Sequence, residues 1–507
     1  MGRKVGARKP KSRAKPQTAP RGAPPRPLNK LQCMLRPRSV AVIGVSEKLN
    51  AGHIILNNIL GEGFDRAHVH VIKPGAREIE GCICYPDVAS LPEKVDLFIL
   101  SVDAAQVPGL VEDVCRTGKA EALIVIPGGI GEKLGTEDLA TRIRTALHAA
   151  RSTPAGGPIV NGGNCLGIRS RPGHYDTLFI PSYKLPPTIC PEAPVALISQ
   201  SGAYAICILS KLGHYNLRYL ISVGNQSDLT IGDYLTFLAA DTETTVYSCY
   251  VEGFAPGDRE QFLTAARTII KSGRKVVLYV AGRTRPGAVA ARSHTASTTG
   301  DYHETVKLAE AAGVIVAHTV ADFEDLCRLL AGQRKKPRDV RRIAAISNAG
   351  FECVAIADNL GALELAELTA DTRDRLADLL KRCRVDAIVG VQNPLDLTPM
   401  ANDAAFTEAV RICLEDANVD AAVVGCVPLT GMLSTLAAGP AHREDVTRDD
   451  AFAARLIRIA GAVDKPVVAA IDSGTAYDAL AARLEAGGIV TFRTADQATR
   501  ILAAANA

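Results

Sequence analysis

The stretch Val195-Ala-Leu-Ile-Ser-Gln-Ser-Gly-Ala-Tyr204 decides the fold, because it joins a strand to a helix through a small polar turn. Its first five residues are the short apolar run of a buried strand, and apolar residues continue after the turn at helical spacing, at Ala205, Ile206, Ile208 and Leu209. Ser201, which a glycine follows, is well placed to cap the helix. The free N–H groups of the first helical turn are then available to an anion. The sequence therefore predicts a strand–turn–helix unit with an anion site at its junction.

The same alternation of short β-branched runs and amphipathic stretches continues along the whole chain. Continuous apolar strands with helical crossovers are typical of parallel sheets that are covered on both faces. We therefore predict an α/β fold with three sheet units. The predicted strands are Ser39–Gly44, Val69–Lys73, Leu97–Val102 and Ala122–Pro127, then Val195–Ser199, Tyr219–Val223, Val246–Glu252 and Val276–Ala281, and finally Arg342–Ser347, Ala387–Val391, Ala421–Val427, Pro466–Ile471 and Ile489–Phe492.

Two linkers divide the chain into three domains after a basic leader. Residues 1–30 hold ten Lys or Arg residues, no acidic residue and several prolines, which predicts a disordered, solubilising tail. A tether to nucleic acid or to another anionic surface is the alternative for this tail. Pro172–Pro194 lacks periodicity and Gly332–Arg338 is a charged joint, so we place boundaries near 190 and 335. The predicted domains are residues 31–190, 191–335 and 336–507.

The composition indicates an ordinary globular protein of the cytoplasm. The chain has 507 residues, of which 47% are hydrophobic and 22% charged. Without the tail, 48 basic residues face 54 acidic ones, so the folded body is mildly acidic, and we expect no nucleic-acid partner. No apolar segment follows the basic start, and the uncharged stretch Ala421–Ala441 is interrupted by Pro428 and Gly431, so we predict neither a secretory signal nor a membrane span. Thirteen cysteines, scattered singly apart from Cys82 and Cys84, favour reduced thiols, and we predict no metal site in this chain.

The first domain begins with the turn Val42-Ile-Gly-Val-Ser46, which leads from a strand toward a helix and indicates a nucleotide site. Ser46 stands where the dinucleotide fingerprint requires its second glycine, which disfavours NAD. The second strand ends in Lys73-Pro74 rather than in an acid, and a lysine suits a phosphorylated ribose. Coenzyme A carries such a phosphate. The alternative is a Rossmann-like domain that binds nothing.

Polar groups also gather at the strand ends of the second domain. The turn Ser222–Asp228 follows one predicted strand and Glu252 ends the next, at the edge where open α/β sheets place their ligands. His294 stands among small and hydroxyl residues after a further strand. Since imidazole is a neutral nucleophile at pH 7 and leaves readily once phosphorylated, His294 is a candidate phosphate carrier. Glu252 is the candidate to orient the ring by accepting its other N–H.

Four motifs of the second domain occur in a fixed order: Ser199-Gln-Ser-Gly-Ala203, Ser222-Val-Gly-Asn225, Tyr250-Val-Glu-Gly253 and Ser293-His-Thr295. Together with Gly162-Gly-Asn-Cys-Leu-Gly167, Asn348-Ala-Gly350 and Asn393-Pro-Leu-Asp-Leu-Thr398, they resemble the α-subunit part of NDP-forming acyl-CoA synthetases, relatives of succinyl-CoA synthetase, over residues 35 to 505. The chain departs from the family pattern at Ala296, at Lys73-Pro-Gly75 and after Asn348-Ala-Gly350. The resemblance implies a Rossmann-like CoA-binding domain followed by two flavodoxin-like domains.

The resemblance also implies a reaction and its residues. Acid, CoA and ATP or GTP would give acyl-CoA, ADP or GDP and phosphate, through an acyl phosphate and a phosphohistidine. His294 would carry the phosphoryl group and Glu252 would position its imidazole. The phosphate would lie against Ser201, Gly202, Ala203 and Asn225. The first domain would hold CoA through Gly44, Val45, Ser46, Lys73, Pro74, Ser101, Val102, Gly128, Gly129 and Asn164.

The chain contains no P-loop, and the tail and three α/β units use all 507 residues. The resemblance therefore implies a separate ATP-grasp β subunit that supplies the nucleotide and Mg²⁺ site, in an α₂β₂ assembly. Two alternatives stay open: a CoA-dependent acyl or carbamoyl transferase without nucleotide chemistry, and a CoA-sensing module without catalysis.

Overall fold

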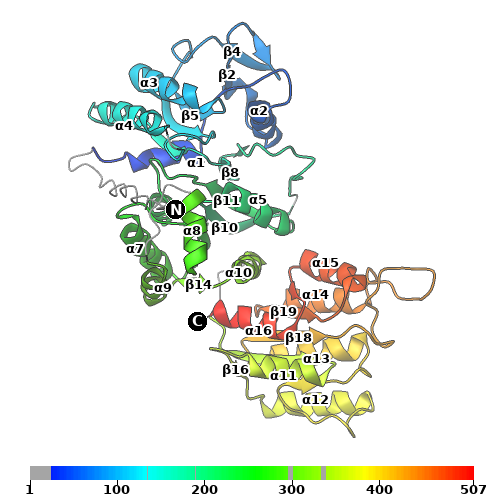
Figure 1. Cartoon of the computed structure of the whole chain (residues 1–507). Coiled ribbons are helices and arrows are strands. Elements are labelled where there is room, and N and C mark those ends of the chain that lie inside the picture. Colours follow the sequence, from blue (N-terminus) through cyan, green and yellow to red (C-terminus); the bar gives the residue numbers. More distant parts are fainter. Residues whose placement is uncertain (1–23, 134, 189, 295–300, 333–338, 507) are drawn as a thin grey trace, which may run out of the picture.

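The computed structural model describes residues 24–133, 135–188, 190–294, 301–332 and 339–506. Three α/β units follow one another along the chain, each built on its own sheet (Figure 1). The first unit (blue to cyan) and the third (yellow to red) lie at opposite ends of the molecule, with the second (green) between them. The predicted fold class is confirmed.

The first sheet has the strand order β3-β4-β2-β1-β5-β6-β7, and its neighbouring strands are parallel except for β3 and β4. Without the short edge strand β3, this is the order of a Rossmann-like sheet. The order in which strands are added along the sheet reverses between the parallel strands β1 and β5, and a crevice opens at their carboxyl ends. Helices α3 and α4 pack together on the sheet (Figure 1). The elements are β1 (Val40–Ile43), α2 (Ala51–Gly61), η2 (Arg66–His68), β2 (Val69–Ile72), β3 (Glu78–Ile79), β4 (Cys82–Tyr85), β5 (Val95–Leu100), η3 (Ala104–Gln106), α3 (Val107–Thr117), β6 (Ala120–Val125), α4 (Glu137–Arg151) and β7 (Ile159–Gly162).

The second sheet has the order β14-β13-β12-β10-β11-β8-β9. Its five parallel strands reproduce the flavodoxin order, with the reversal between β10 and β12. The strands β8 and β9, which precede the predicted domain boundary near 190, add to the edge of this sheet in antiparallel orientation. The elements are β8 (Ile168–Ser170), β9 (Tyr175–Asp176), β10 (Glu192–Ser199), α5 (Gly202–Lys211), β11 (Asn216–Ser222), α6 (Ile231–Leu238), β12 (Val246–Val251), α7 (Asp258–Lys271), β13 (Lys275–Val280), α8 (Arg285–His294), α9 (Tyr302–Ala311), β14 (Ile315–Ala317) and α10 (Val320–Gly332).

The third sheet repeats the flavodoxin order as β16-β15-β18-β19-β20, with β17 paired to the end of β15. The elements are β15 (Arg342–Ser347), α11 (Gly350–Asp358), β16 (Glu364–Leu365), α12 (Ala370–Arg382), β17 (Leu395–Asp396), α13 (Asp403–Glu415), β18 (Ala421–Cys426), α14 (Phe452–Ala462), β19 (Val467–Ile471), η4 (Thr475–Tyr477), α15 (Asp478–Ala486), β20 (Val490–Phe492) and α16 (Ala495–Ala504).

The predicted strand Ala387–Val391 is wrong. Residues 386–388 form a turn, residues 389–391 belong to no helix or strand, and Ile388 is 71% exposed. The side chain of Asn393 takes the place of a strand beside β15: its Oδ1 accepts the N–H of Ala345 at 2.9 Å, and its Nδ2 donates to the carbonyl of Ile343 at 2.8 Å. Because the carboxamide of Asn393 satisfies these backbone groups of β15, they are not available to pair with residues 387–391 as a strand.

The prediction that residues 1–30 form a tail without structure is wrong for residues 24–30; residues 1–23 lie outside the described part. The 3-10 helix η1 (Leu28–Lys30) leads into α1 (Leu31–Leu35). Arg26 pairs with the buried Asp233 of α6 at 2.9 Å, and Lys30 pairs with Glu121 of β6 at 2.6 Å. The end of the predicted tail is therefore fixed by ion pairs to both neighbouring domains.

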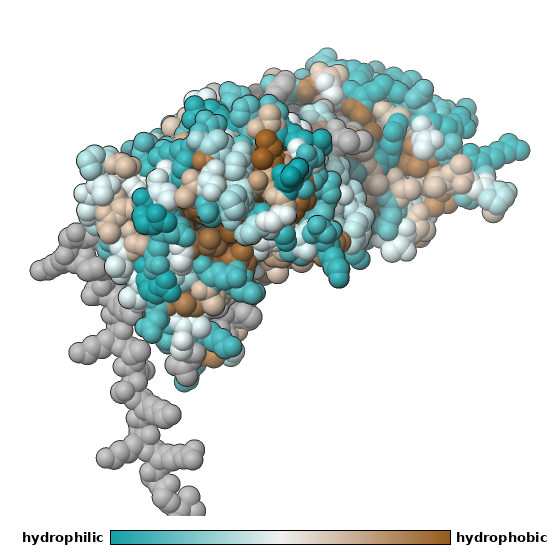
Figure 2. All heavy atoms as spheres, turned by 90° about the horizontal axis from the view of Figure 1, so that it is seen from above, coloured by the Kyte–Doolittle hydropathy of each residue, from teal (hydrophilic) through white to brown (hydrophobic). Residues whose placement is uncertain are grey.

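The second and third domains share a hydrophobic core between α10 and α16. Leu326 and Leu330 of α10 belong to the same buried cluster as Ile501 and Leu502 of α16. Polar contacts flank this core, among them the ion pair between Arg328 and Glu485. The surface seen in Figure 2 is mainly hydrophilic, with hydrophobic residues in separate small patches. Among the described helices, none combines the length and apolarity that crossing a membrane requires.

Candidate functional site

The loops after β1 and β5 meet at the crevice of the first sheet. Gly44 has a φ of +94°, and a Cβ there would overlap the carbonyl oxygen of Ser101 and approach Val102 to 3.3 Å. Asn50 caps α2 and shapes the loop, because its Nδ2 donates to the carbonyl of Gly44 at 2.8 Å. Glycine is therefore required at Gly44, and the structure brings together the predicted CoA residues Gly44, Val45, Ser46, Ser101 and Val102.

Lys73 and Pro74 follow β2, the neighbour of β1, and so stand at the same edge of the sheet. The N–H of Lys73 donates to the carbonyl of Tyr85 at 2.8 Å and continues the pairing of β2 with β4.

The carbonyl of Ser46 lies 2.6 Å from Nδ1 of His53 in the first turn of α2. Since a carbonyl only accepts, this contact requires the proton on Nδ1.

Gly128, Gly129 and Asn164 form a second group at this edge. The N–H of Asn164 donates to the carbonyl of Pro127 at 2.9 Å, and a Cβ on Gly128 would lie 2.9 Å from Oδ1 of Asn164. A Cβ on Gly129 would lie 3.6 Å from Ala104, which follows β5. The loops after β5, β6 and β7 are thus adjacent at the carboxyl edge of the sheet, the edge at which open α/β sheets bind their ligands.

Ser201 is the N-cap of α5, as predicted: its hydroxyl accepts the N–H of Tyr204 at 3.2 Å. Gly202 and Ala203 open the helix, and Ala203 is exposed. A Cβ on Gly202 would lie 2.8 Å from Leu166, so the loop after β7 packs against this helix end. The remaining N–H groups of the first turn face the carboxyl edge of the second sheet and are suited to an anion.

The predicted CoA and phosphate residues meet at one contact. Nδ2 of Asn164 lies 3.5 Å from Oδ1 of Asn225, and the N–H of Asn225 donates to the carbonyl of Gly163 at 2.9 Å. The chain continues beside β7, where Ser227 and Leu229 donate to the carbonyls of Gly162 and Val160. The two carboxyl edges are therefore joined through backbone hydrogen bonds.

Glu252 directly follows β12, the strand next to β10, so it lies across the switch point from the cap of α5. Tyr250, two residues earlier on the same strand, is a hydrogen-bond partner of Glu252. Burial raises the pKa of the Tyr250 hydroxyl, and the charge of Glu252 raises it further. The phenol therefore stays protonated and available as a donor to the carboxylate.

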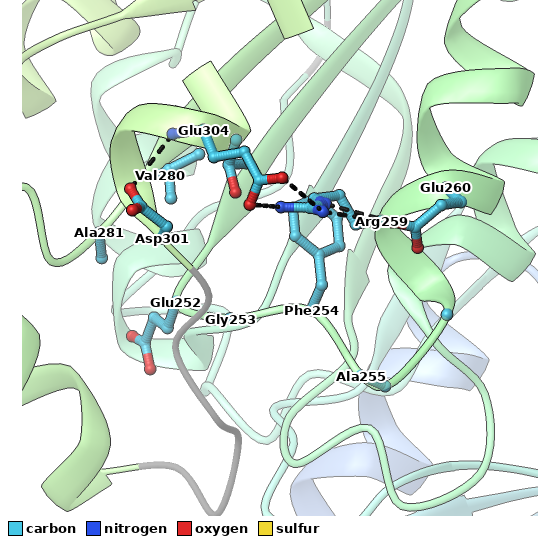
Figure 3. Close-up of a pocket in the computed structure, with 12 residues that line it drawn as sticks. Glu252, Gly253, Phe254, Ala255, Arg259, Glu260, Val280, Ala281, Asp301 and Glu304 are labelled. Carbon is cyan, nitrogen blue, oxygen red and sulfur yellow. Dashed lines mark hydrogen bonds and ion pairs between the residues drawn. The ribbon is translucent and has the colours of Figure 1, made fainter. Parts of the chain in front are cut away.

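A cavity of about 320 Å³ lies beside Glu252 (Figure 3). Arg259 lines this cavity and pairs with Glu304 at 3.0 Å and Glu260 at 3.3 Å, while the carboxylate of Glu252 points away from this network (Figure 3). Sequence reasoning missed these charged residues, because they come from helix starts far apart in the chain.

His294 is the last residue of α8, and its side chain lies outside the described part, as do residues 295–300. Ala281, before α8, and Asp301, the N-cap of α9, both line the cavity beside Glu252. The segment that carries His294 therefore starts and ends at the wall of this cavity. The predicted contact between His294 and Glu252 stays a prediction.

Comparisons with known proteins follow the same domain pattern. A CoA binding domain model matches residues 38–171, and a succinyl-CoA ligase like flavodoxin domain model matches residues 192–330. The α subunit of acetate–CoA ligase (ADP-forming) I of Pyrococcus furiosus is 31% identical over 398 residues, which cover 76% of this chain and 80% of the relative. Acetate–CoA ligase (ADP-forming) I of Archaeoglobus fulgidus is 31% identical over 79% of this chain, but the chain spans only 56% of that relative's length.

A solved structure agrees: the dinucleotide forming acetyl-coenzyme A synthetase 1 of Ca. Korarchaeum cryptofilum, in complex with phosphate and ADP, matches with a TM-score of 0.80 and 27% identity, over 94% of this chain and 96% of that one. These matches confirm the predicted resemblance, and the enzyme class that it implied is the class of these relatives. The chain belongs to the family of ADP-forming acyl-CoA synthetases, of which acetate–CoA ligases are members.

Proposed function

We propose that this chain is the α subunit of a nucleotide-dependent acid–CoA ligase, which converts acid, CoA and ATP into acyl-CoA, ADP and phosphate. One arrangement carries the proposal: Asn164, on the loop after β7, lies 3.5 Å from Asn225 on the loop after β11, and Leu166 of the same first-domain loop packs against Gly202 at the start of α5. A thioester forms only where the thiol of CoA reaches an activated acyl group, and this junction would bring the two proposed sites together.

The residues at the first crevice fit CoA. The backbone at Gly44 and Ser101 leaves no room for a side chain, which allows the close backbone approach that a diphosphate needs. Gly44, Val45, Ser46, Ser101 and Val102 would hold the diphosphate, and Lys73 with Pro74 would face the phosphorylated ribose. Gly128, Gly129 and Asn164 would hold the arm that leads toward α5.

The phosphoryl group would travel on His294. An imidazole nitrogen bonds to the γ-phosphorus of ATP while the bond to ADP breaks; the phosphoryl group then passes to a carboxylate oxygen of the acid and frees the ring. The N–H groups of Gly202 and Ala203, with Ser201 and Asn225, would hold the phosphoryl oxygens. Glu252 would accept the other ring N–H and keep the attacking nitrogen unprotonated. Phosphate leaves when the thioester forms.

We propose a separate ATP-grasp β subunit as the partner, in an α₂β₂ assembly. The name of the Pyrococcus furiosus relative, a subunit alpha, supports a second kind of chain. The partner would supply the site for ATP or GTP and Mg²⁺, and His294 would shuttle between that site and α5.

The test is His294→Asn in the complex with its co-purified partner. We expect no turnover and no phosphate on the peptide that carries residue 294, measured by mass spectrometry near neutral pH, while CoA binding by calorimetry stays unchanged. Turnover of the variant at the normal rate would exclude the phosphohistidine. A wild-type protein that takes no phosphate from ATP and Mg²⁺ would favour a nucleotide-independent transferase or a CoA sensor.

A further inference from the structure

We propose that Gln200 and Gln226 are positioning residues, whose buried carboxamides hold the Glu252–Gly253 turn from two sides. The inference deepens the proposed function and rests on it for the role of Glu252. The family resemblance implied no role for either glutamine, although Gln200 lies within the motif Ser199–Ala203. Both lie at the carboxyl edge of the second sheet, Gln200 after β10 and Gln226 after β11.

The side-chain oxygen of Gln200 accepts both backbone N–H groups of the Glu252–Gly253 turn. Its Oε1 accepts the N–H of Glu252 at 2.8 Å and the N–H of Gly253 at 3.1 Å. The backbone N–H of Gln200 donates to the carbonyl of Tyr250 at 3.0 Å, which extends the pairing of β10 with β12 by one residue. The side chain is 3% exposed, so water does not compete for these bonds.

Gln226 binds the carbonyl of Gly253, the residue whose N–H Gln200 accepts. Its Nε2 donates to the carbonyl of Gly253 at 2.9 Å, and its Oε1 accepts the N–H of Ile231 at the start of α6 at 3.1 Å. The residue is 8% exposed and has a φ of 51°, a left-handed conformation that a glutamine adopts only where its surroundings fix it.

The hydrogen bonds define the orientation of both side chains. Turning the Gln200 carboxamide over would set its NH₂ group against two N–H donors, and turning that of Gln226 would set oxygen against the carbonyl of Gly253. A carboxamide is also the neutral group that provides this acceptor, whereas glutamate would place a second carboxylate beside Glu252.

Gln200 and Gln226, together called the clamp, connect the parts of the proposed site. Gln200 precedes Ser201, the cap of α5, and Gln226 follows Asn225, which contacts Asn164 of the CoA-binding domain. The position of Glu252 is therefore tied to both phosphate-binding loops. Loss of either carboxamide would let the carboxylate move relative to α5, at a centre where small displacements cost rate.

The experiment compares Gln200→Met and Gln226→Met with Gln261→Met, a matched control on α7 whose side chain bonds Asp233 and Thr236 instead. In the holoenzyme with its partner, we expect phosphate uptake in a single turnover to slow about 10- to 100-fold in both test variants. The KM for CoA should stay within about twofold, because the CoA loops are unchanged. Gln200→Glu, which keeps the acceptor oxygen, should recover part of the rate at low pH and lose it as the pH rises.

Hydrogen exchange of the peptide that spans residues 250–254 gives a second readout that does not need activity. We expect faster exchange in Gln200→Met than in the control, because two N–H groups lose their acceptor. Equal exchange, or phosphate uptake at the wild-type rate in both test variants, would overturn the clamp. A wild-type enzyme that takes no phosphate, with faster exchange in Gln200→Met, would instead overturn the proposed function and support the clamp.

Discussion

Glu352 is a buried carboxyl group whose neutralisation should stabilise the third domain at alkaline pH. It lies in the first turn of α11 and is 0% exposed. The hydroxyl of Ser347 bonds its Oε2, and among the described residues Oε1 has no hydrogen-bond partner. Burial raises the pKa of Glu352 from 4.5 to about 7, against the lowering effect of the Ser347 hydroxyl. The perturbation is Glu352→Gln, which has the same shape and no charge.

The sign follows from proton binding. Between about pH 4.5 and 7 the folded chain keeps a proton on Glu352 that the unfolded chain releases, so the free energy of unfolding falls as the pH rises through this window. At roughly 1.4 kcal/mol for each pKa unit, the loss is about 3 kcal/mol. Glutamine has no proton to lose. We therefore expect the variant to match the wild type near pH 4.5 and to exceed it by up to ~3 kcal/mol at pH 8.

Thermal unfolding of both proteins at pH 5 and pH 8 measures this difference. A domain of this size gains ~2–4 °C in Tm per kcal/mol, so the transition of the third domain should rise by several degrees at pH 8 only. Asp176 and Asp258, whose pKa values burial also raises, affect both proteins equally. Glu364→Gln, at an exposed position of β16, is the control. A variant that is less stable than the wild type at pH 8, or equally shifted at both pH values, would refute the reasoning.

Two further variants test the first domain. Gly44→Ala should weaken CoA binding about tenfold or more, because the new Cβ drives the loop away from Ser101; Gly63→Ala, with a φ of +83° but nothing within 4 Å, is the calorimetric control, and equal affinities would remove this loop from the CoA site. Asp228→Asn should destabilise the junction of the first two domains by about 3 kcal/mol. The buried guanidinium of Arg151 bonds both carboxylate oxygens of Asp228, and asparagine offers it one neutral oxygen in their place. Scanning calorimetry checks this, and an unchanged Tm would contradict it.

The sequence predicted those features that depend on local pattern. Val195–Tyr204 predicted a strand, a cap and a helix, and β10, Ser201 and α5 stand there, because apolar periodicity and a capping hydroxyl act within a few residues. Ala387–Val391 has the same apolar pattern and begins in a turn. The difference lies in Asn393, whose side chain occupies the backbone groups of β15. No local signal distinguishes a run that pairs from one whose partner is already satisfied.

The prediction of a disordered leader was wrong at residues 24–30 for a related reason. Its composition gave no reason for structure, yet Arg26 and Lys30 are held by Asp233 and Glu121. A cation in a disordered tail and one that finds a buried carboxylate two hundred residues later look the same in a sequence. The partner, and not the residue itself, decides between them.

The candidate site shows the same dependence on topology, and it explains why the glutamines were overlooked. Gln200 stands inside the motif that first indicated an anion site, but the N–H groups that it accepts lie 52 and 53 residues further along the chain. They are within reach because the strand order places β10 beside β12, with β11 on its other side. A polar residue after the first strand of such a sheet can therefore reach the turn after the neighbouring strand, as Gln200 does with Glu252 and Gly253. Once this order is established, the residues that hold the turn carrying Glu252 can be sought directly after the central strand, whether or not any motif assigns them a role.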